Sequence, residues 1–174
     1  DGASVVSGCD DDQVHIWRLE GPTVTICVGH EGIVWSARWR PSVSGAQILS
    51  AGGDAAVKLW SESGELLQSI EAHQRGVHCV AWRPDGQFFA SASADYSVRI
   101  WRADGARVRT LVGHGDAVWQ VRYSPDGKRL ASVSSYRTVR LWSHSGELLK
   151  TWSDHTDTVW HVSFSPDGQY VISA

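Results

Sequence analysis

The sequence lacks several features that define large classes of proteins. No apolar run reaches the roughly 20 residues that a helix needs to cross a bilayer, so neither a membrane span nor a membrane partner is expected. Basic residues are not in excess, because the formal net charge is −3, which argues against a strongly basic nucleic-acid binder. Residues 1–4 have no basic region followed by an apolar stretch, so no signal peptide is expected. Charged residues at 20% and hydrophobic residues at 42% exclude a disordered chain.

Cysteine and methionine are scarce. The three cysteines, Cys9, Cys27 and Cys79, are odd in number and far apart, so neither a disulfide framework nor a CxxC metal clip is expected. Buried free thiols in a reducing compartment, the cytoplasm, are the better interpretation. Methionine is absent altogether, even as an initiator, which favours a piece of a longer chain. Tryptophan, in contrast, is abundant, with ten residues.

The tryptophans and histidines indicate a tandem repeat. One tryptophan recurs at spacings of 43, 41 and 41 residues, and one histidine recurs at the same spacings. These residues are Trp17, Trp60, Trp101 and Trp142, and His30, His73, His114 and His155. Each of the four tryptophans ends a run in which apolar and polar residues alternate, which is typical of a half-buried β-strand.

Pro-Asp-Gly sequences mark tight turns inside the repeats. They occur in residues 83–87, 124–128 and 165–169, where proline presets φ and glycine accepts a positive φ. The first repeat has a longer loop at this place, residues 41–47, which accounts for its two extra residues. Each period is therefore expected to hold four short antiparallel strands and no helix. One such sheet cannot bury both of its faces alone, so neighbouring sheets are expected to stack around an axis.

These features together resemble the WD-repeat family of β-propellers. The resemblance rests on the histidine that closes a short apolar segment, the Val-x-x-Val-x-aromatic strand, the Pro-Asp-Gly turn, a serine, an aspartate and the closing tryptophan, and it covers essentially all 174 residues. The dipeptide that names the family is absent, and the glycine before the histidine is replaced in two repeats. The departing residues are Arg18, Ser61, Arg102 and Ser143 after the tryptophan, and Ala72 and Asp154 before the histidine.

The resemblance implies an all-β fold, a β-propeller of four-stranded antiparallel blades in a single domain, residues 1–174. Three complete blades are expected at about 33–70, 77–112 and 118–152, with partial blades at 1–28 and 159–174. Seven blades are typical of the family, and at about forty residues each they need roughly 290 residues. The chain is therefore expected to be a segment of a larger propeller. The rival arrangement is a second copy that completes an eight-bladed ring.

The resemblance also implies a buried hydrogen-bonded tetrad of histidine, serine, aspartate and tryptophan in each repeat. The matching sets are His30, Ser50, Asp54 and Trp60; His73, Ser91, Asp95 and Trp101; and His114, Ser132 and Trp142, with Tyr136 in the place of the aspartate. Ser7, Asp11 and Trp17 form a set without a histidine, and His155 and Ser173 form one without an aspartate or a tryptophan. Because Tyr136 leaves His114 without a carboxylate, its repeat is expected to be locally weaker.

Serine, histidine and aspartate also form nucleophilic triads, but a triad is normally one constellation in one cleft. Here the set recurs at a fixed period beside a large aromatic residue, which favours a structural role and no catalytic residue. No cofactor or metal site is expected, because no phosphate-binding loop or paired metal ligands are present. His15 and His144 are expected to be exposed, and Trp39, Trp82, Tyr123 and Phe164 to lie in the core.

In the family, partners are contacted by residues around the mouth of the propeller, its top face. The positions that match are Trp35, His78, Trp119 and Trp160, five residues after each histidine, together with Ile33, Thr158 and Asp10 and their small equivalents in other repeats. Tryptophan is frequent in binding hot spots, and an aromatic rim could hold a Lys or Arg side chain. The alternative is that these tryptophans only plug the channel and pack on each other.

The sequence therefore predicts a non-catalytic scaffold that binds a protein or peptide through its top face, without nucleic acid. Other subunits of a complex are candidate partners. The alternative is a regulatory or sensor propeller of a larger signalling enzyme, such as an ATPase, a kinase or a protease.

Overall fold

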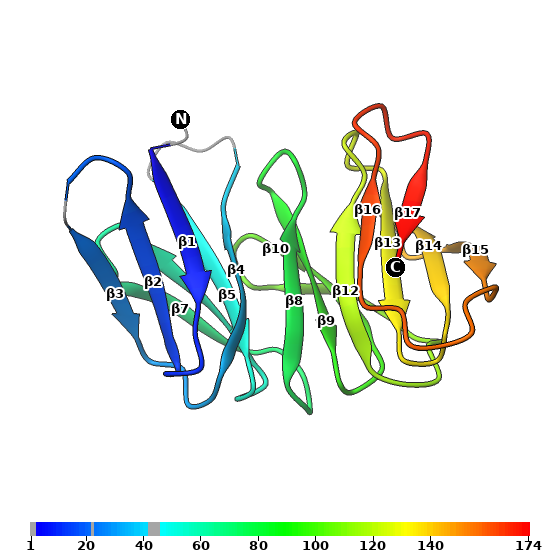
Figure 1. The fold of residues 1–174 in the computed structure, drawn as a ribbon, viewed down its shortest axis with the longest axis horizontal. Coiled ribbons are helices and arrows are strands. Elements are labelled where there is room, and N and C mark those ends of the chain that lie inside the picture. Colours follow the sequence, from blue (N-terminus) through cyan, green and yellow to red (C-terminus); the bar gives the residue numbers. More distant parts are fainter. Residues whose placement is uncertain (1–2, 22, 42–45) are drawn as a thin grey trace.

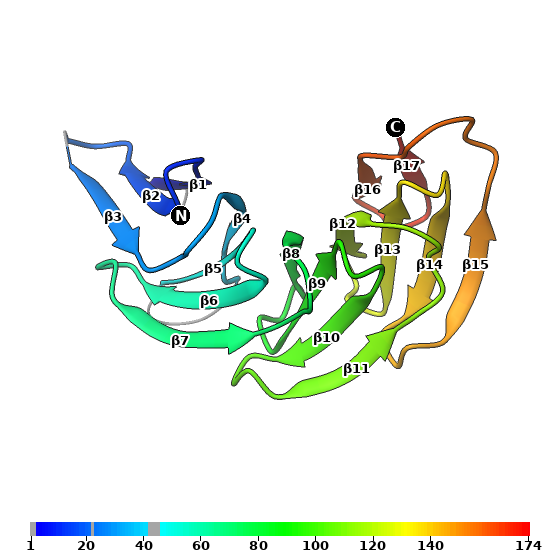
Figure 2. The same ribbon diagram turned by 90° about the horizontal axis from the view of Figure 1, so that it is seen from below.

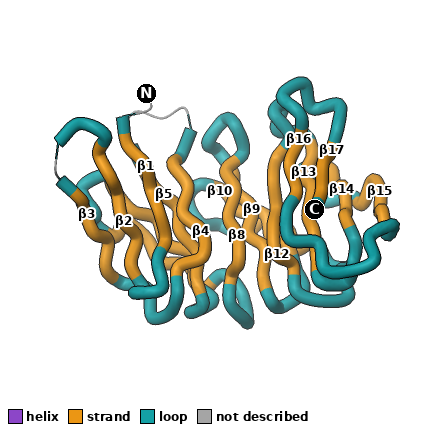
Figure 3. Tube along the Cα trace, viewed as in Figure 1, coloured by secondary structure: helices purple, strands orange, loops and turns teal. Residues whose placement is uncertain are grey.

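A computed structural model describes residues 3–21, 23–41 and 46–174. Residues 42–45, most of the longer loop expected in the first repeat, lie outside the described residues, as do residues 1–2 and 22. The described part of the chain is all-β, with strands joined by loops and turns and without a helix (Figure 3). It accordingly contains no apolar helix of the length that a bilayer requires.

The strands form five antiparallel sheets. The first contains β1 (Ser4–Gly8), β2 (Gln13–Arg18) and β3 (Val24–Val28). The second contains β4 (Val34–Trp39), β5 (Gln47–Gly52), β6 (Ala56–Ser61) and β7 (Leu66–Glu71). The third contains β8 (Val77–Trp82), β9 (Phe88–Ser93), β10 (Val98–Arg102) and β11 (Arg107–Leu111). The fourth contains β12 (Val118–Tyr123), β13 (Arg129–Ser134), β14 (Val139–Ser143) and β15 (Leu148–Trp152). The fifth contains β16 (Val162–Phe164) and β17 (Val171–Ser173).

The sheets stand side by side along an open arc (Figures 1 and 2). Figure 2 shows that β4, β8, β12 and β16 lie on the concave side of the arc, whereas β7, β11 and β15 lie on its convex side. Neighbouring inner strands contact one another, β4 with β8, β8 with β12 and β12 with β16. The predicted architecture of three four-stranded blades flanked by two incomplete ones is confirmed.

The Pro-Asp-Gly turns join the first and second strands of three sheets. In the turn between β8 and β9, Gly86 has a φ of 68°, which a residue with a Cβ rarely adopts. The carboxylate of Asp85 accepts a hydrogen bond from the backbone N–H of Gln87 at 3.0 Å, and thereby closes the turn. Gly127 and Gly168 take the same conformation in the equivalent turns. Local sequence therefore fixes where each hairpin reverses.

Each repeat tryptophan packs its sheet onto the preceding one. Trp60, on β6, is fully buried in a cluster with Val14 and Ile16 of the first sheet. Trp101 packs in the same way against Leu59, and Trp142 against Ile100. Replacing a buried tryptophan by alanine typically costs about 3–5 kcal/mol, so these contacts are a main source of cohesion between sheets.

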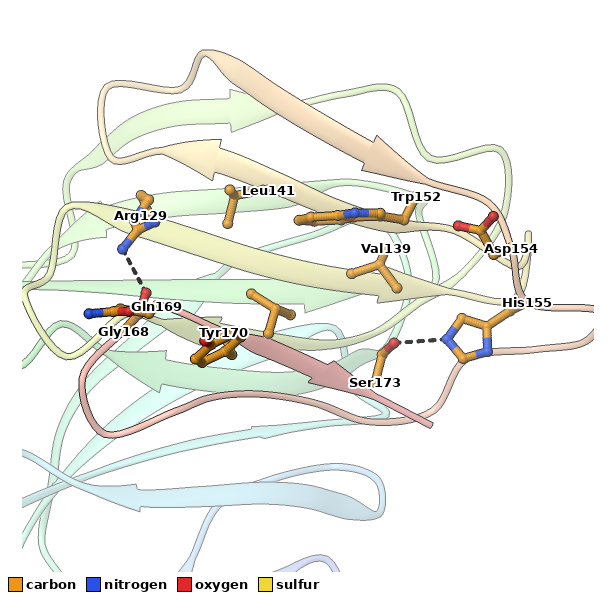
Figure 4. A pocket seen from close by; sticks show the side chains of 11 residues that line it. Arg129, Val139, Leu141, Trp152, Asp154, His155, Gly168, Gln169, Tyr170 and Ser173 are labelled. Atoms are coloured by element: carbon orange, nitrogen blue, oxygen red, sulfur yellow. Dashed lines mark hydrogen bonds between the residues drawn. The ribbon is translucent and has the colours of Figure 1, made fainter.

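The two ends of the arc have uncovered blade faces. Trp17 is 46% exposed, although its equivalent Trp60 is 0% exposed, because no described sheet precedes β1–β3. At the other end, β16 and β17 leave a cavity of about 490 Å³ against the fourth sheet (Figure 4). Val139, Leu141 and Trp152 line its apolar wall. The sheets thus do not close into a ring, as in a segment of a propeller.

Candidate functional site

The first complete tetrad is a chain of hydrogen bonds that crosses the second sheet. The Trp60 indole Nε1–H donates to Ser50 Oγ at 2.7 Å. Ser50 Oγ lies 2.7 Å from His30 Nε2, and His30 Nδ1 lies 2.8 Å from Asp54 Oδ2. Because the carboxylate can only accept, the imidazole donates from Nδ1 to Asp54. Burial lowers the pKa of His30, so at neutral pH Nε2 carries no proton and accepts from the Ser50 hydroxyl. The histidine in this chain is therefore neutral.

The second tetrad repeats this geometry and adds two contacts. Trp101 Nε1 donates to Ser91 Oγ at 2.9 Å, and His73 lies 2.7 Å from Ser91 Oγ and 2.9 Å from Asp95 Oδ2. The Asp95 carboxylate also accepts from the Ser97 hydroxyl at 2.6 Å and from Arg99 Nη2 at 3.2 Å. Every polar atom of this chain is thereby satisfied, as burial requires.

Burial sets the charge states within the tetrads. It lowers the pKa of His73 to about 4, although the charge of Asp95 opposes the shift. Burial by itself would raise the pKa of Asp95, but the Ser97 hydroxyl and the neighbouring His73 lower it to about 2. Burial lowers the pKa of His114 to about 3, and the charge of Arg140 adds to the shift. At neutral pH the histidines are uncharged and Asp95 is ionised.

The third set finds another partner for its histidine. His114 Nε2 contacts Ser132 Oγ at 2.7 Å, but His114 Nδ1 lies 3.0 Å from Thr138 Oγ1. Tyr136 does not take part, because its side chain is 65% exposed. Arg140, the equivalent of Arg99, forms no ion pair within the described residues. The buried Nε of both arginines has no hydrogen-bond partner there. Sequence reasoning anticipated the missing carboxylate and missed Thr138.

The two incomplete tetrads form the hydrogen bonds that their remaining residues permit. Trp17 Nε1 donates to Ser7 Oγ at 2.9 Å, and Asp11 contacts His15 at 3.0 Å. At the other end, His155 Nε2 lies 2.8 Å from Ser173 Oγ, at the rim of the cavity in Figure 4.

The prediction that His15 and His144 are exposed is wrong. Both are half-buried, His15 against the Asp11 carboxylate and His144 against the Phe88 ring, with 4.8 Å between ring centroids. The expected core aromatics differ in depth. Trp82 and Tyr123 are buried, whereas Trp39 and Phe164 are half-buried, Phe164 in the last and incomplete sheet.

Four aromatic side chains form a continuous row across the concave side of the arc, near the start of the inner strands. We name Trp35, His78, Trp119 and Trp160 the aromatic row. The ring centroids of Trp35 and His78 are 4.9 Å apart, those of His78 and Trp119 are 4.1 Å apart and stacked, and those of Trp119 and Trp160 are 4.5 Å apart. One residue from each of three successive sheets and Trp160, from the loop that enters β16, thus join into a single π surface.

The aromatic row is held in place from behind and is open in front. Trp119 Nε1 donates to Ser135 Oγ at 2.7 Å, and His78 Nδ1 donates to the Val118 carbonyl oxygen at 3.1 Å. A Cβ at Gly76 would approach the Trp35 ring to 2.6 Å, so only glycine leaves room for this indole. Trp35 and Trp160 nevertheless remain 46% and 57% exposed. Burial lowers the pKa of His78, so its imidazole is neutral at pH 7.

The loops around the row carry the other predicted contact residues. Ile33 and Thr158 are half-buried in the loops that enter β4 and the fifth sheet, and Asp10 is exposed between β1 and β2. The loops that enter the inner strands are hydrogen-bonded to the loops between the second and third strands of the same sheets. Gly53 N donates to the Ile33 carbonyl oxygen at 2.9 Å, and Ser135 N donates to the Ala117 carbonyl oxygen at 3.0 Å. All the positions expected to contact a partner therefore lie along one edge of the arc, the edge at which the inner strands begin.

These loops are strongly acidic. Their carboxylates are Asp10, Asp11, Asp12, Glu31, Asp54, Asp95, Asp116, Asp154 and Asp157, and their only arginines are Arg75 and Arg137. Asp116 and Asp157 stand three residues before Trp119 and Trp160, and one oxygen of each accepts from the next backbone N–H at 2.6 Å. The edge of the arc that carries the aromatic row thus combines aromatic faces with negative charge.

One group of side chains among the described residues has donor atoms close enough to hold a metal ion. The ligand atoms of Cys9, Asp11 and His15 lie within 4.8 Å of one another. Asp11 and His15 already contact each other in the manner of Asp95 and Arg99. A structural pair thus accounts for two of the three residues without an ion.

Sheets that lean on one another through one buried tryptophan each are the blades of a β-propeller, and the open arc is a segment of such a protein. A family model described as "WD domain, G-beta repeat" matches residues 21–61, 64–102, 105–143 and 146–174. The chain therefore belongs to the WD40 repeat family. Repeats of this family generally mediate protein–protein interactions and are typically non-catalytic. Comparison with curated proteins gave no match.

Proposed function

We propose that the chain is a non-catalytic scaffold that binds a protein partner on the aromatic row, through a segment of the partner that carries Arg or Lys. The observation that carries the proposal is the continuous π surface of four rings, of which Trp35 and Trp160 remain about half exposed.

A non-catalytic role is supported by the state of the tetrad serines. Ser50, Ser91 and Ser132 are each 0% exposed. The oxygen of each already accepts from an indole N–H and faces a histidine. A nucleophile must reach its substrate, and these hydroxyls have neither access to one nor a free position. Their repetition in three sheets supports a role in stability.

The chemistry of the partner follows from the surroundings of the row. A guanidinium or ammonium group over the face of an indole gains about 0.5–2 kcal/mol from the ring quadrupole. The neutral His78 in the middle of the row adds no repulsive charge. Asp116, on the loop that enters β12, and Asp157, on the loop that carries Trp160, supply negative charge beside Trp119 and Trp160. A basic segment satisfies both features at once.

A defined peptide tests this proposal. A blocked Gly-Arg-Gly-Arg-Gly peptide is titrated into the chain, and binding is followed by tryptophan fluorescence and calorimetry. Peptides with citrulline or glutamate in place of arginine serve as uncharged and reversed-charge probes. We expect the arginine peptide to bind most tightly and Trp160→Ala to weaken it about tenfold or more, as for a hot-spot residue. Leu149→Ala, which removes an equally exposed apolar side chain on the convex β15, is the control.

Two charge variants separate the acidic loops from a general effect of charge. Asp116→Asn with Asp157→Asn is expected to weaken the arginine peptide a few-fold and to flatten its salt dependence. Glu65→Gln with Glu147→Gln removes the same charge from turns at the opposite edge of the arc and is expected to leave peptide binding unchanged. If the citrulline peptide binds as well as the arginine peptide, the basic partner is excluded. If Trp160→Ala leaves all binding intact, the aromatic row is excluded as the site.

The cysteines support a reducing, cytoplasmic location as part of this proposal. Cys9, Cys27 and Cys79 are all free thiols. Cys27 and Cys79 are buried as predicted, but Cys9 is exposed, so the prediction of a buried thiol is wrong for this residue. Burial raises the pKa of the Cys27 thiol to about 11, so this side chain is inert and packs as a small apolar group.

A further inference from the structure

A second cavity opens near the other end of the inner strands. It has a volume of about 250 Å³ and lies against β4, β8 and β12. Its lining residues are Arg38, Trp39, Pro41, Ala81, Trp82, Arg122 and Tyr123. The aromatic row lies near the first residues of these strands, whereas this cavity is lined by their last residues. The two sites therefore use different side chains of the same strands.

The repeat pattern places two arginines on either side of a small residue. Arg38, Ala81 and Arg122 each stand eight residues after the histidine of their repeat, on three successive inner strands. Ala81 on the middle strand leaves open the space that a longer side chain would fill. The two guanidinium groups thus border one cavity from two sides.

Neither guanidinium has a counter-charge. Arg38 Nη1 donates to the Ala37 carbonyl oxygen at 2.8 Å, and Arg122 Nη1 donates to the Val121 carbonyl oxygen at 3.1 Å and contacts Cys79 Sγ at 3.2 Å. Within the described residues neither forms an ion pair, whereas Arg99 and Arg102 both do. Burial, followed by the charge of Arg122, lowers the pKa of Arg38, so the two cations repel each other.

The cavity wall contains further donors without acceptors. The indole Nε1 atoms of Trp39 and Trp82 are buried and have no hydrogen-bond partner among the described residues. Trp82 as a whole is 8% exposed. Buried donors are normally paired. A cavity wall with two unpaired indole donors, and with two guanidiniums that have no carboxylate partner within the described residues, therefore lacks acceptors and negative charge.

We propose that Arg38 and Arg122 bind a phosphate group in this cavity. A phosphate brings up to two negative charges and several acceptor oxygens, which match two guanidinium groups better than a single carboxylate does. Arginine is suited to this role because its planar fork of N–H donors fits phosphate oxygens in pairs. The anion would relieve the repulsion between the two cations and link β4 to β12 across β8.

Thermal unfolding at constant ionic strength tests the site. The probe is inorganic phosphate at 10 mM, with acetate and chloride as reference anions. A ligand that binds only the folded chain raises Tm. We expect phosphate to raise the Tm by about 3–6 °C over chloride, the shift that a phosphate concentration about ten times the Kd gives for a domain of this size. Acetate is expected to give less than half of that shift.

Matched variants decide whether the shift comes from this cavity. Arg38→Gln and Arg122→Gln are each expected to abolish the phosphate shift. Arg109→Gln is expected to keep it, because Arg109, on the convex β11, likewise bonds only to carbonyl oxygens. Calorimetric titration with phosphate gives a second readout that does not depend on the stability of each variant. An equal shift in Arg38→Gln with Arg122→Gln, or an equal shift with acetate, would overturn the proposal.

A further arm identifies the source of the phosphate. Blocked phosphoserine amide is titrated in place of inorganic phosphate. Binding of the amino-acid derivative with the same dependence on Arg38 and Arg122 assigns the site to a phosphorylated side chain of a protein. Binding of inorganic phosphate alone assigns it to the free anion. Because the aromatic row is not involved, Trp160→Ala is expected to leave both results unchanged.

Discussion

Tyr136→Asp restores the one residue that separates the third tetrad from the second, and we expect it to stabilise the protein. In the second tetrad the Asp95 carboxylate accepts from His73 at 2.9 Å and pairs with Arg99 at 3.2 Å. In the third, Thr138 bonds to His114 and Arg140 has no ion pair within the described residues. An aspartate at position 136 would serve both groups.

The expected gain is the balance of three contributions. A hydrogen bond to a charged acceptor contributes about 1.5–3 kcal/mol, and the half-exposed pair with Arg140 adds about 0–1 kcal/mol. The neutral bond between His114 and Thr138 is lost, at about 0.5–1.5 kcal/mol. Little packing is lost, because Tyr136 is 65% exposed, with its ring beside Gly115. The net stabilisation is about 1–2 kcal/mol, a rise in Tm of about 3–6 °C for a domain of this length.

Urea unfolding at pH 7 and pH 3, followed by near-ultraviolet circular dichroism, measures the effect. The gain depends on an ionised carboxylate with a depressed pKa, so it is fully present above pH 4 and is lost as the pH falls towards about 2, the pKa of Asp95. Tyr170→Asp is the control, because it adds the same charge at a tyrosine of similar exposure, 67%, outside any tetrad. A Tyr136→Asp variant no more stable than the wild type at pH 7 would refute the reasoning.

Two further predictions follow from the tetrads and from the aromatic row. The folded state keeps His73 and His114 neutral with pKa values of about 4 and 3, while an unfolded histidine binds a proton below about pH 6.5. Stability in urea is therefore expected to fall between pH 6.5 and pH 4, and a flat profile there would contradict the assignment of buried neutral imidazoles. Gly76→Ala places a methyl group 2.6 Å from the exposed Trp35 ring, so we expect the ring to move away from His78. Binding of the arginine peptide is then expected to weaken, whereas the free energy of unfolding is expected to change by less than about 1 kcal/mol. Gly53→Ala, with an ordinary 3.6 Å contact to the same ring, is the control and is expected to bind the arginine peptide normally.

The fold was predictable because its signals are local and repeated. Alternation in runs such as 98–101 fixes a strand, and Pro-Asp-Gly at 84–86 fixes the turn between β8 and β9. The recurrence of Trp60, Trp101 and Trp142 then shows that one unit is reused. The resemblance to WD repeats named the residues of the tetrads, although the spacing alone could not say that their side chains meet.

Substitutions inside a repeat were harder to interpret. Thr138 stands two residues after Tyr136, and nothing in the sequence says that its hydroxyl turns towards His114. The half-buried state of His144 was missed for a similar reason, since it depends on Phe88 in a neighbouring sheet. Arg38 and Arg122 carried no signal of their own, although their equal distance from the repeat histidine could have paired them.

The sequence by itself determined the strands, the turns, the period and the family, because these depend on residues close together along the chain. Only the tertiary structure decided that Trp35, His78, Trp119 and Trp160 touch as one row, and that Arg38 and Arg122 border one cavity across Ala81. Both arrangements join side chains about forty or more residues apart. The distance between these side chains depends on the twist of each sheet and on how closely neighbouring sheets pack. Both are properties of the packing between sheets and not of any one repeat.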